Sequence, residues 1–246
     1  TTHPDGGDDA GSDAGAIFDT IVDTDADGGA DADAEFVCVS DDGGFPRELT
    51  LPLPDPNGVF DPELAWDPDT GRLWMSYSGV DGPAGSGRVS THLSYSEDHG
   101  ITWCHAGVIN PSTDVPRVDQ PASIAKDHAH WSHEVSSLTR DPAAPSEARW
   151  RLVWHRYLHV EDGVEGNEDR HFEHGWIAQR TAATPEGLFA APERKLFSST
   201  IYHFDPAIEA YNDAAAGGLP LHRWDTDPAL AGCLVFTEPG MAAVAG

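Results

Sequence analysis

The chain has 246 residues, with 42 Asp and Glu against 14 Lys and Arg, and a formal net charge of −28. Such a charge repels phosphate backbones and anionic lipid, which excludes charge-driven binding to nucleic acid or to a membrane surface. No apolar run approaches the roughly 18 residues that a spanning helix needs, so we expect no transmembrane segment. The composition favours a neutral or cationic ligand.

The first 35 residues differ in composition from the rest. They are nearly all Asp, Gly, Ala, Thr and Ser, and residues 1–42 hold 13 acids without any Lys or Arg. They contain too little apolar surface to offset the entropy lost on ordering, so we expect a disordered acidic linker at 1–35 before a domain at 36–246. Such stretches resemble the tethers that follow the lipidated cysteine of bacterial surface lipoproteins. The resemblance implies an extracellular or cell-surface protein with a lipid anchor outside this chain.

A calcium-loop spacing lies inside this linker. DTDADG at 23–28 has the D-x-D-x-D-G pattern, whose twelfth position should be a bidentate Glu. That position is Ala34, with Glu35 one residue late, and no helices are expected on either side. A charged tether is therefore the preferred interpretation, and a weak calcium site is the alternative.

The cysteine content and the first residue bear on processing. The chain begins with Thr rather than Met, so we expect a processed or trimmed product. None of the cysteines has C-x-x-C spacing, which disfavours a zinc or redox site. At most one disulfide is possible, and the sequence leaves its pairing open among Cys38, Cys104 and Cys233.

From Phe60 onward the chain alternates short apolar runs with turn residues, which is typical of an all-β fold. The pattern predicts four strands, at 63–66, 72–78, 89–95 and 102–108. Four antiparallel strands within about 48 residues form one blade-sized unit of a β-propeller.

A second series of strands follows. We expect strands at 133–139, 149–160, 176–181 and 194–198, a polar loop at 161–174, a short helix within 205–231, and an apolar strand at 233–238. The recurrence predicts a propeller of four-stranded antiparallel blades, of the five- or six-bladed type. Because closure needs at least four blades, we expect the propeller to be incomplete at its C-terminus. The 246-residue chain should then be aggregation-prone and inactive, since an open ring exposes a sheet edge.

One motif lies between the third and fourth expected strands. SEDHGITW at 96–103 matches S-x-D-x-G-x-T-W at every fixed position: Ser96, Asp98, Gly100, Thr102 and Trp103. It resembles the Asp-box, or BNR repeat, of the sialidase-like β-propellers, where it caps the same hairpin. Asp98 can accept turn amides, Gly100 permits a left-handed backbone, and Trp103 can bury the turn. The motif indicates a fold and carries no chemistry.

A second resemblance is to five-bladed glycoside hydrolase propellers of the furanosidase type, which bring carboxylates from the first strands of successive blades to the central axis. Matching positions are FDPE with Asp61, WSHEV with Glu134, and FTEPG with Glu238. The resemblance implies Asp61 as the catalytic base, Glu238 as the acid and Glu134 as the group that tunes them. For Asp61 a structural D-P turn is the alternative, because the same dipeptide recurs at Asp67, Asp141 and Asp205.

Candidate substrate-binding residues are Trp131, His133, His155 and Arg156. Indole rings can stack on sugar faces, although inter-blade core is the alternative use of Trp. On a strand, alternate residues share a face, so His155 and His159 could approach one ligand together. We prefer hydrogen bonding to sugar hydroxyls, or ordinary surface histidines, over a metal site, for which nothing supplies the remaining ligands.

These observations predict a glycoside hydrolase acting on a neutral carbohydrate by acid/base carboxylates, without a cofactor or metal. Sialic acid is disfavoured, because three clamping arginines and a Tyr nucleophile cannot be assigned. The alternative is a non-catalytic BNR-repeat propeller that binds carbohydrate or protein at the cell surface.

Overall fold

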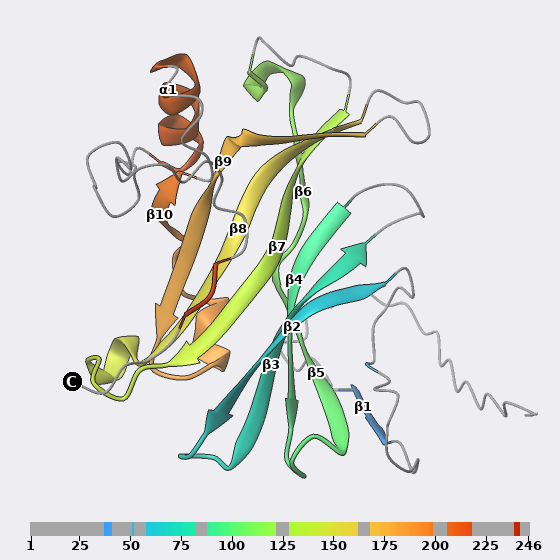
Figure 1. The fold of residues 1–246 in the computed structure, drawn as a ribbon, viewed down its shortest axis with the longest axis vertical. Helices are drawn as coiled ribbons and strands as arrows, with labels where there is room; N and C mark the ends of the chain where they lie inside the picture. Colours follow the sequence, from blue (N-terminus) through green and yellow to red (C-terminus); the bar gives the residue numbers. More distant parts are fainter. Residues whose placement is uncertain are drawn as a thin grey trace, which may run out of the picture. The chain divides into compact units, whose positions relative to one another are not determined.

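Two five-stranded antiparallel sheets make up most of the residues that the computed structural model describes (Figure 1). The structure describes residues 37–40, 51, 58–81, 88–121, 128–161, 168–198, 206–217 and 239–241. The linker 1–35, the expected strand at 233–238, Cys233 and Glu238 lie outside these residues. By its contacts, Phe36–Gly246 forms one compact unit.

The first sheet has the order β1-β5-β4-β3-β2. Its strands are β1 (Val37–Ser40), β2 (Val59–Asp67), β3 (Arg72–Asp81), β4 (Arg88–Ser96) and β5 (Thr102–Asn110). The turn between β2 and β3 begins at Asp67, whose carboxylate accepts hydrogen bonds from the Asp69 N–H (3.1 Å) and the Thr70 hydroxyl (2.6 Å). The D-P-D-T-G segment is thus a turn closed by its own first side chain.

The second sheet has the order β10-β9-β8-β7-β6. Its strands are β6 (Thr113–Val115), β7 (His128–Arg140), β8 (Trp150–Glu161), β9 (Glu168–Ala182) and β10 (Arg194–Ser198). Helix α1 (Pro206–Ala215) contacts β9, and lies within the segment where a short helix is expected. Among the described residues, no helix has the length and apolar character needed to cross a membrane.

The all-β class predicted from the alternating pattern agrees with these sheets, but two details differ. Each expected four-stranded unit has a fifth strand, β1 in the first sheet and β6 in the second. Both added strands are too short, at four and three residues, to show an alternating pattern. The expected loop at 161–174 is wrong in part, because β9 begins at Glu168. Its polar first residues are extended because they pair with the end of β8.

The core lies between the sheets, where β7 contacts β2, β3 and β4. One buried cluster joins Trp74 and Leu93 of the first sheet to Leu138 and Trp154 of the second. Arg180 on β9 also donates from Nε to the Asn110 Oδ1 at the end of β5 (3.1 Å). These contacts fix β2 of the first sheet relative to β7 of the second.

Candidate functional site

Asp61 lies at a bulge in β2. The pairing of β2 with β3 shifts register between Phe60 and Glu63, and Asp61 has a φ of 52°. A residue other than glycine with positive φ is uncommon, and bulges re-aim side chains. Its carboxylate is exposed, so the local backbone presents an acid to solvent at a defined place.

Glu134 lies at a second bulge, in β7. The pairing of β7 with β8 shifts register between Glu134 and Ser137, and Val135 has a φ of 49°. For a β-branched residue such a φ is a steric outlier, and strain of this kind concentrates at functional sites. Glu134 is 7% exposed, and its Oε2 accepts a hydrogen bond from the Tyr157 hydroxyl (3.1 Å).

The two bulges are linked through Ser78 of β3. The Val135 N–H donates to the Ser78 hydroxyl oxygen (2.9 Å), and Ser78 pairs with Phe60, which precedes Asp61. Asp61 follows Phe60, and Glu134 precedes Val135. Ser78 therefore links the neighbours of the two candidate catalytic acids, by a β-pair on one side and a hydrogen bond on the other.

Glu238 is not described, but the chain directly after it is. The Met241 N–H donates to the Ser137 hydroxyl oxygen (3.1 Å), and the Thr139 hydroxyl donates to the Met241 carbonyl oxygen (3.3 Å). Residues 239–241 thus lie against β7, and Ser137 is three residues after Glu134.

The candidate substrate-binding residues lie on both faces of the second sheet. His133 is opposite Arg156 in register, whereas Glu134 is opposite His155. Because side chains alternate along a strand, Trp131, His133 and Arg156 occupy one face, and His155 occupies the other face together with Glu134. The structure does not bring Trp131, His133 and Arg156 together with the candidate acid Glu134, since the sheet itself separates them.

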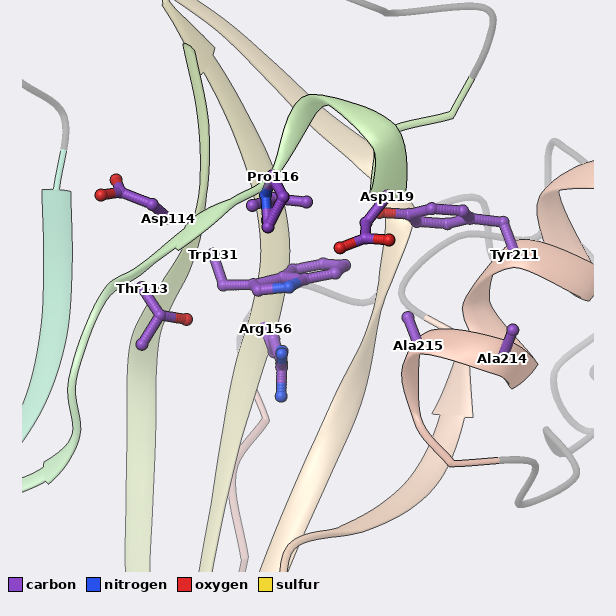
Figure 2. Close-up of a pocket in the computed structure, with 10 residues that line it drawn as sticks. Thr113, Asp114, Pro116, Asp119, Trp131, Arg156, Tyr211, Ala214 and Ala215 are labelled. Atoms are coloured by element: carbon purple, nitrogen blue, oxygen red, sulfur yellow. The ribbon is translucent and has the colours of Figure 1, made fainter.

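Two pockets open on the face that carries Arg156. The larger, which we call the aromatic pocket, has a volume of about 480 Å³, and its lining includes Thr113, Val115, Asp119, Trp131, Arg156 and Tyr211. In Figure 2 the β6 residues lie on one side of Trp131 and the α1 residues on the other. The smaller, which we call the arginine pocket, has a volume of about 170 Å³, and its lining includes Asn110, Thr113, His133, Arg156, Arg180 and Glu193. The pockets share Thr113 and Arg156.

Arg156 is held between aromatic rings. Its guanidinium carbon lies 4.5 Å from the Trp131 ring centroid and 4.7 Å from that of Trp176. Nη1 donates to both carboxylate oxygens of Glu193 (3.0 Å each), and Oε1 of Glu193 also accepts from the Trp176 Nε1 (3.0 Å). Stacking and ion pairing together fix this arginine at the junction of the pockets.

Two of the histidines are neutral by burial. The pKa of His133 is held well below its usual value by burial, and then by the positive charges of Arg156 and Arg180. Its Nδ1 accepts from the Trp154 Nε1 (3.0 Å), so the ring proton is on Nε2. Burial lowers the pKa of His155 to about 3, and its ring lies 4.9 Å from that of Tyr157.

A metal centre has no support within the part of the chain that the structure describes. No group of three or more His, Cys, Asp or Glu side chains in these residues is arranged to hold an ion.

The S-x-D-x-G-x-T-W motif forms the turn between β4 and β5, where the sequence predicts one. Asp98 Oδ1 accepts from the N–H groups of Ile101 (3.0 Å) and Thr102 (2.7 Å), and from the Ser96 hydroxyl (2.7 Å). Gly100 has a φ of 91°, and the Trp103 Nε1 donates to its carbonyl oxygen (3.1 Å). Trp103 is 2% exposed, so its indole closes the turn over the sheet.

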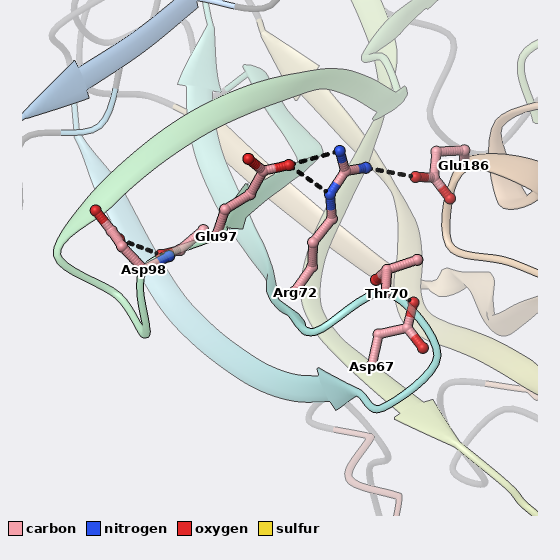
Figure 3. Close-up of polar contacts among 7 residues, drawn as sticks. Asp67, Thr70, Arg72, Glu97, Asp98 and Glu186 are labelled. Atoms are coloured by element: carbon pink, nitrogen blue, oxygen red, sulfur yellow. Dashed lines mark hydrogen bonds and ion pairs between the residues drawn. The ribbon is translucent and has the colours of Figure 1, made fainter.

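An ion-pair bridge adjoins this turn (Figure 3). Arg72 donates two hydrogen bonds to Glu97 (2.7 and 3.0 Å), which precedes Asp98 in the turn. It donates a third to Glu186 (3.2 Å), in the short 3-10 turn between β9 and β10. Its guanidinium also lies 4.3 Å from the Tyr95 ring centroid. The partners are largely exposed, so the bridge contributes little to stability.

The sequence interpretation missed several residues of these sites, among them Tyr157, Asn110, Arg180 and Glu193. Tyr157 was detectable, because the alternation that places His155 on one face also places Tyr157 there. The other three have no sequence signal, since their contacts join residues as far apart as 110 and 180.

Comparison with known proteins places this chain in no family. No family model matches it, and no curated protein matches its sequence. A solved structure described as "Sialidase" is similar with a TM-score of 0.38 and 17% identity, over 70% of this chain and 14% of that one. The chain thus spans only 14% of that structure's length. A likeness of this level assigns neither a family nor an activity.

Proposed function

We propose that the two sheets are blades of a β-propeller and that the protein is a glycoside hydrolase acting on a neutral carbohydrate. One observation carries the proposal: Asp61 and Glu134 lie at two strained bulges, in β2 of one sheet and β7 of the other, and the bulges are linked through Ser78 of β3. Strained backbone persists only where the surroundings hold it, and two such sites linked in this way favour a functional role.

The three acids take different roles in this proposal. Asp61 is exposed and acts as the base that activates water, whereas Glu238 protonates the leaving oxygen. Glu134 is buried, and its Oε2 accepts a hydrogen bond from the Tyr157 hydroxyl, which orients the carboxyl group. When ionised, a carboxylate held beside the reacting centre raises the proton affinity of a neighbouring acid and stabilises positive charge on the sugar ring.

The proposal includes export. Cys104 is disulfide-bonded, and disulfides persist mainly in oxidising compartments outside the cytosol. The acidic linker composition of residues 1–35 supports a tether to the cell surface.

The test is hydrolysis of neutral aryl glycosides, measured by release of 4-nitrophenol, with the protein at its full natural length. Replacing Asp61 by Asn, or Glu238 by Gln, should lower kcat by roughly 10²- to 10⁴-fold, because each change removes a proton-transfer group. Asp141→Asn is the matched control, since Asp141 begins the same D-P dipeptide but its carboxylate bonds the Ala143 N–H and the Arg151 guanidinium, away from both bulges. Unchanged turnover by either site variant would refute the assigned role.

The second candidate is a non-catalytic propeller that binds carbohydrate or protein. It is favoured by the position of the aromatic pocket, whose lining includes neither Asp61 nor Glu134. Binding of a neutral oligosaccharide without turnover, lost in Trp131→Ala and retained in Asp61→Asn, would establish this candidate. A protein that neither cleaves nor binds any neutral glycan would refute both.

A further inference from the structure

The arginine pocket is a site apart from the proposed catalytic acids. It lies on the His133 face of the second sheet, opposite the face of Glu134, and neither Glu134 nor Asp61 lines it. A ligand bound there would not touch the two bulges. Its chemistry can therefore be argued without reference to hydrolysis.

Arg180 is fixed on one wall of this pocket. Its Nη1 donates to the carbonyl oxygens of Leu188, Phe189 and Ala191, the last at 2.6 Å. Its Nε donates to the Asn110 Oδ1. The guanidinium is thus oriented before any ligand arrives.

Two donors of the pocket residues lack an acceptor in the structure. Asn110 is 2% exposed, and its Nδ2 is buried without a hydrogen-bond partner. The buried Nε of Arg156 also has none. An unsatisfied buried donor is costly, and such donors are rare in folded proteins. A ligand that supplies acceptors would remove this cost after a small side-chain movement, because both atoms are closed to solvent in the structure.

The charge of the lining is positive within a strongly acidic protein. The lining holds the two arginines and a single acid, Glu193, which already accepts from Arg156 and Trp176. The pKa of Arg180 is lowered, mainly by burial. The negative charge of Glu193 opposes this shift, and the like charge of Arg156 adds to it. His133 is neutral and carries its proton on Nε2, so it adds a donor and no charge.

We propose that the arginine pocket binds the carboxylate of a small organic acid whose apolar body lies in the adjoining aromatic pocket. A planar carboxylate matches the donor geometry of guanidinium groups and relieves the repulsion between Arg156 and Arg180. The aromatic pocket offers Val115, Trp131 and Tyr211 to the body, and the two pockets are continuous through Thr113 and Arg156.

Calorimetric titration of the protein with benzoate tests this site. Benzoate should bind. Benzamide has the same shape without the charge, so its affinity should be lower by about tenfold or more. Inorganic sulfate is the third ligand. If sulfate binds and benzoate does not, the proposal of an organic acid is overturned.

The matched variants are Asn110→Asp and Gln179→Glu. Asn110→Asp keeps the oxygen that accepts from Arg180, replaces the free donor by a second oxygen and adds a negative charge, so benzoate affinity should fall about tenfold or more. Gln179→Glu adds the same charge on the opposite face, next to Arg180 in the chain, and should leave affinity unchanged. Should Asn110→Asp fail to fold, Arg156→Met should abolish binding. The proposal is overturned if a folded Asn110→Asp or Arg156→Met variant binds benzoate as tightly as the wild type.

Discussion

At the scale of single residues, Asp98 shows how one carboxylate can close a turn. Burial acts to raise its pKa, but hydrogen bonds from the Thr102 N–H, the hydroxyls of Ser96 and Thr102, and the Ile101 N–H lower it to about 2. We expect Asp98→Ala to reduce the free energy of unfolding by about 1 to 3 kcal/mol, measured by urea denaturation. Catalysis and ligand binding should not change, because the turn lies outside both candidate sites. A variant as stable as the wild type would contradict this role.

The same carboxylate predicts a pH dependence. A group whose pKa is lower in the folded protein stabilises it above its unfolded pKa, about 3.9 for Asp, and loses this effect as the pH falls through the folded value. The stability difference between the wild type and Asp98→Asn should therefore be full above about pH 4 and shrink toward pH 2. Denaturation curves at a series of pH values measure it. A difference that grows on acidification would show that the sign is wrong.

Val135 allows a test of backbone strain. Because glycine adopts a φ of 49° without a steric cost, Val135→Gly should be close to the wild type in stability, within about 1 kcal/mol. Val153 is the matched control, since it is 2% exposed on the neighbouring strand β8 and has no positive φ. Val153→Gly should cost about 2 to 4 kcal/mol. Equal losses in the two variants would mean that the bulge at Val135 is not strained.

At the scale of elements, Cys104 of β5 forms a disulfide whose expected partner lies on a neighbouring strand. Cys38 in β1 is opposite Cys104 in β5, so we expect these two to be the bonded pair. Peptide mapping without reductant should recover a linked 38–104 fragment. Cys38→Ala should lower the free energy of unfolding by about 2 to 4 kcal/mol, and Cys233→Ala should not. A link that contains Cys233 would contradict the expected pair.

Strand alternation decides how the candidate residues of β7 are shared between two sites. Glu134 and its partner Tyr157 lie on one face, and His133 with Arg156 lies on the other. The sequence predicted one site because these residues are adjacent in the chain. The sheet separates them because successive side chains on a strand point to opposite faces.

At the scale of the whole molecule, residues 1–35 remain a predicted linker. Their composition supplies little apolar surface, so their deletion should leave the melting temperature unchanged within about two degrees. Differential scanning calorimetry measures this shift. A cooperative loss of stability on deletion, or a calcium stabilisation that disappears in Asp25→Ala, would contradict the linker.

Local pattern was enough to predict most strands and one turn. Within β3, three apolar residues alternate with Trp74, Ser76 and Ser78. The motif at Ser96–Trp103 closes through contacts within its own eight residues. Such features depend on neighbours in sequence, so they can be inferred without the fold. The short strands β1 and β6 could not, because they exist only through pairing with β5 and β7.

The sequence by itself determined the all-β class, the acidic linker composition and the closed turn at Asp98, since each follows from local composition and spacing. Only the tertiary structure decided that the bulge after Glu134 bonds Ser78 beside the Asp61 bulge, and that Arg180 reaches Asn110. The physical reason is separation along the chain. Contacts between residues 57 and 70 positions apart depend on how the sheets pack, and no local propensity encodes that packing.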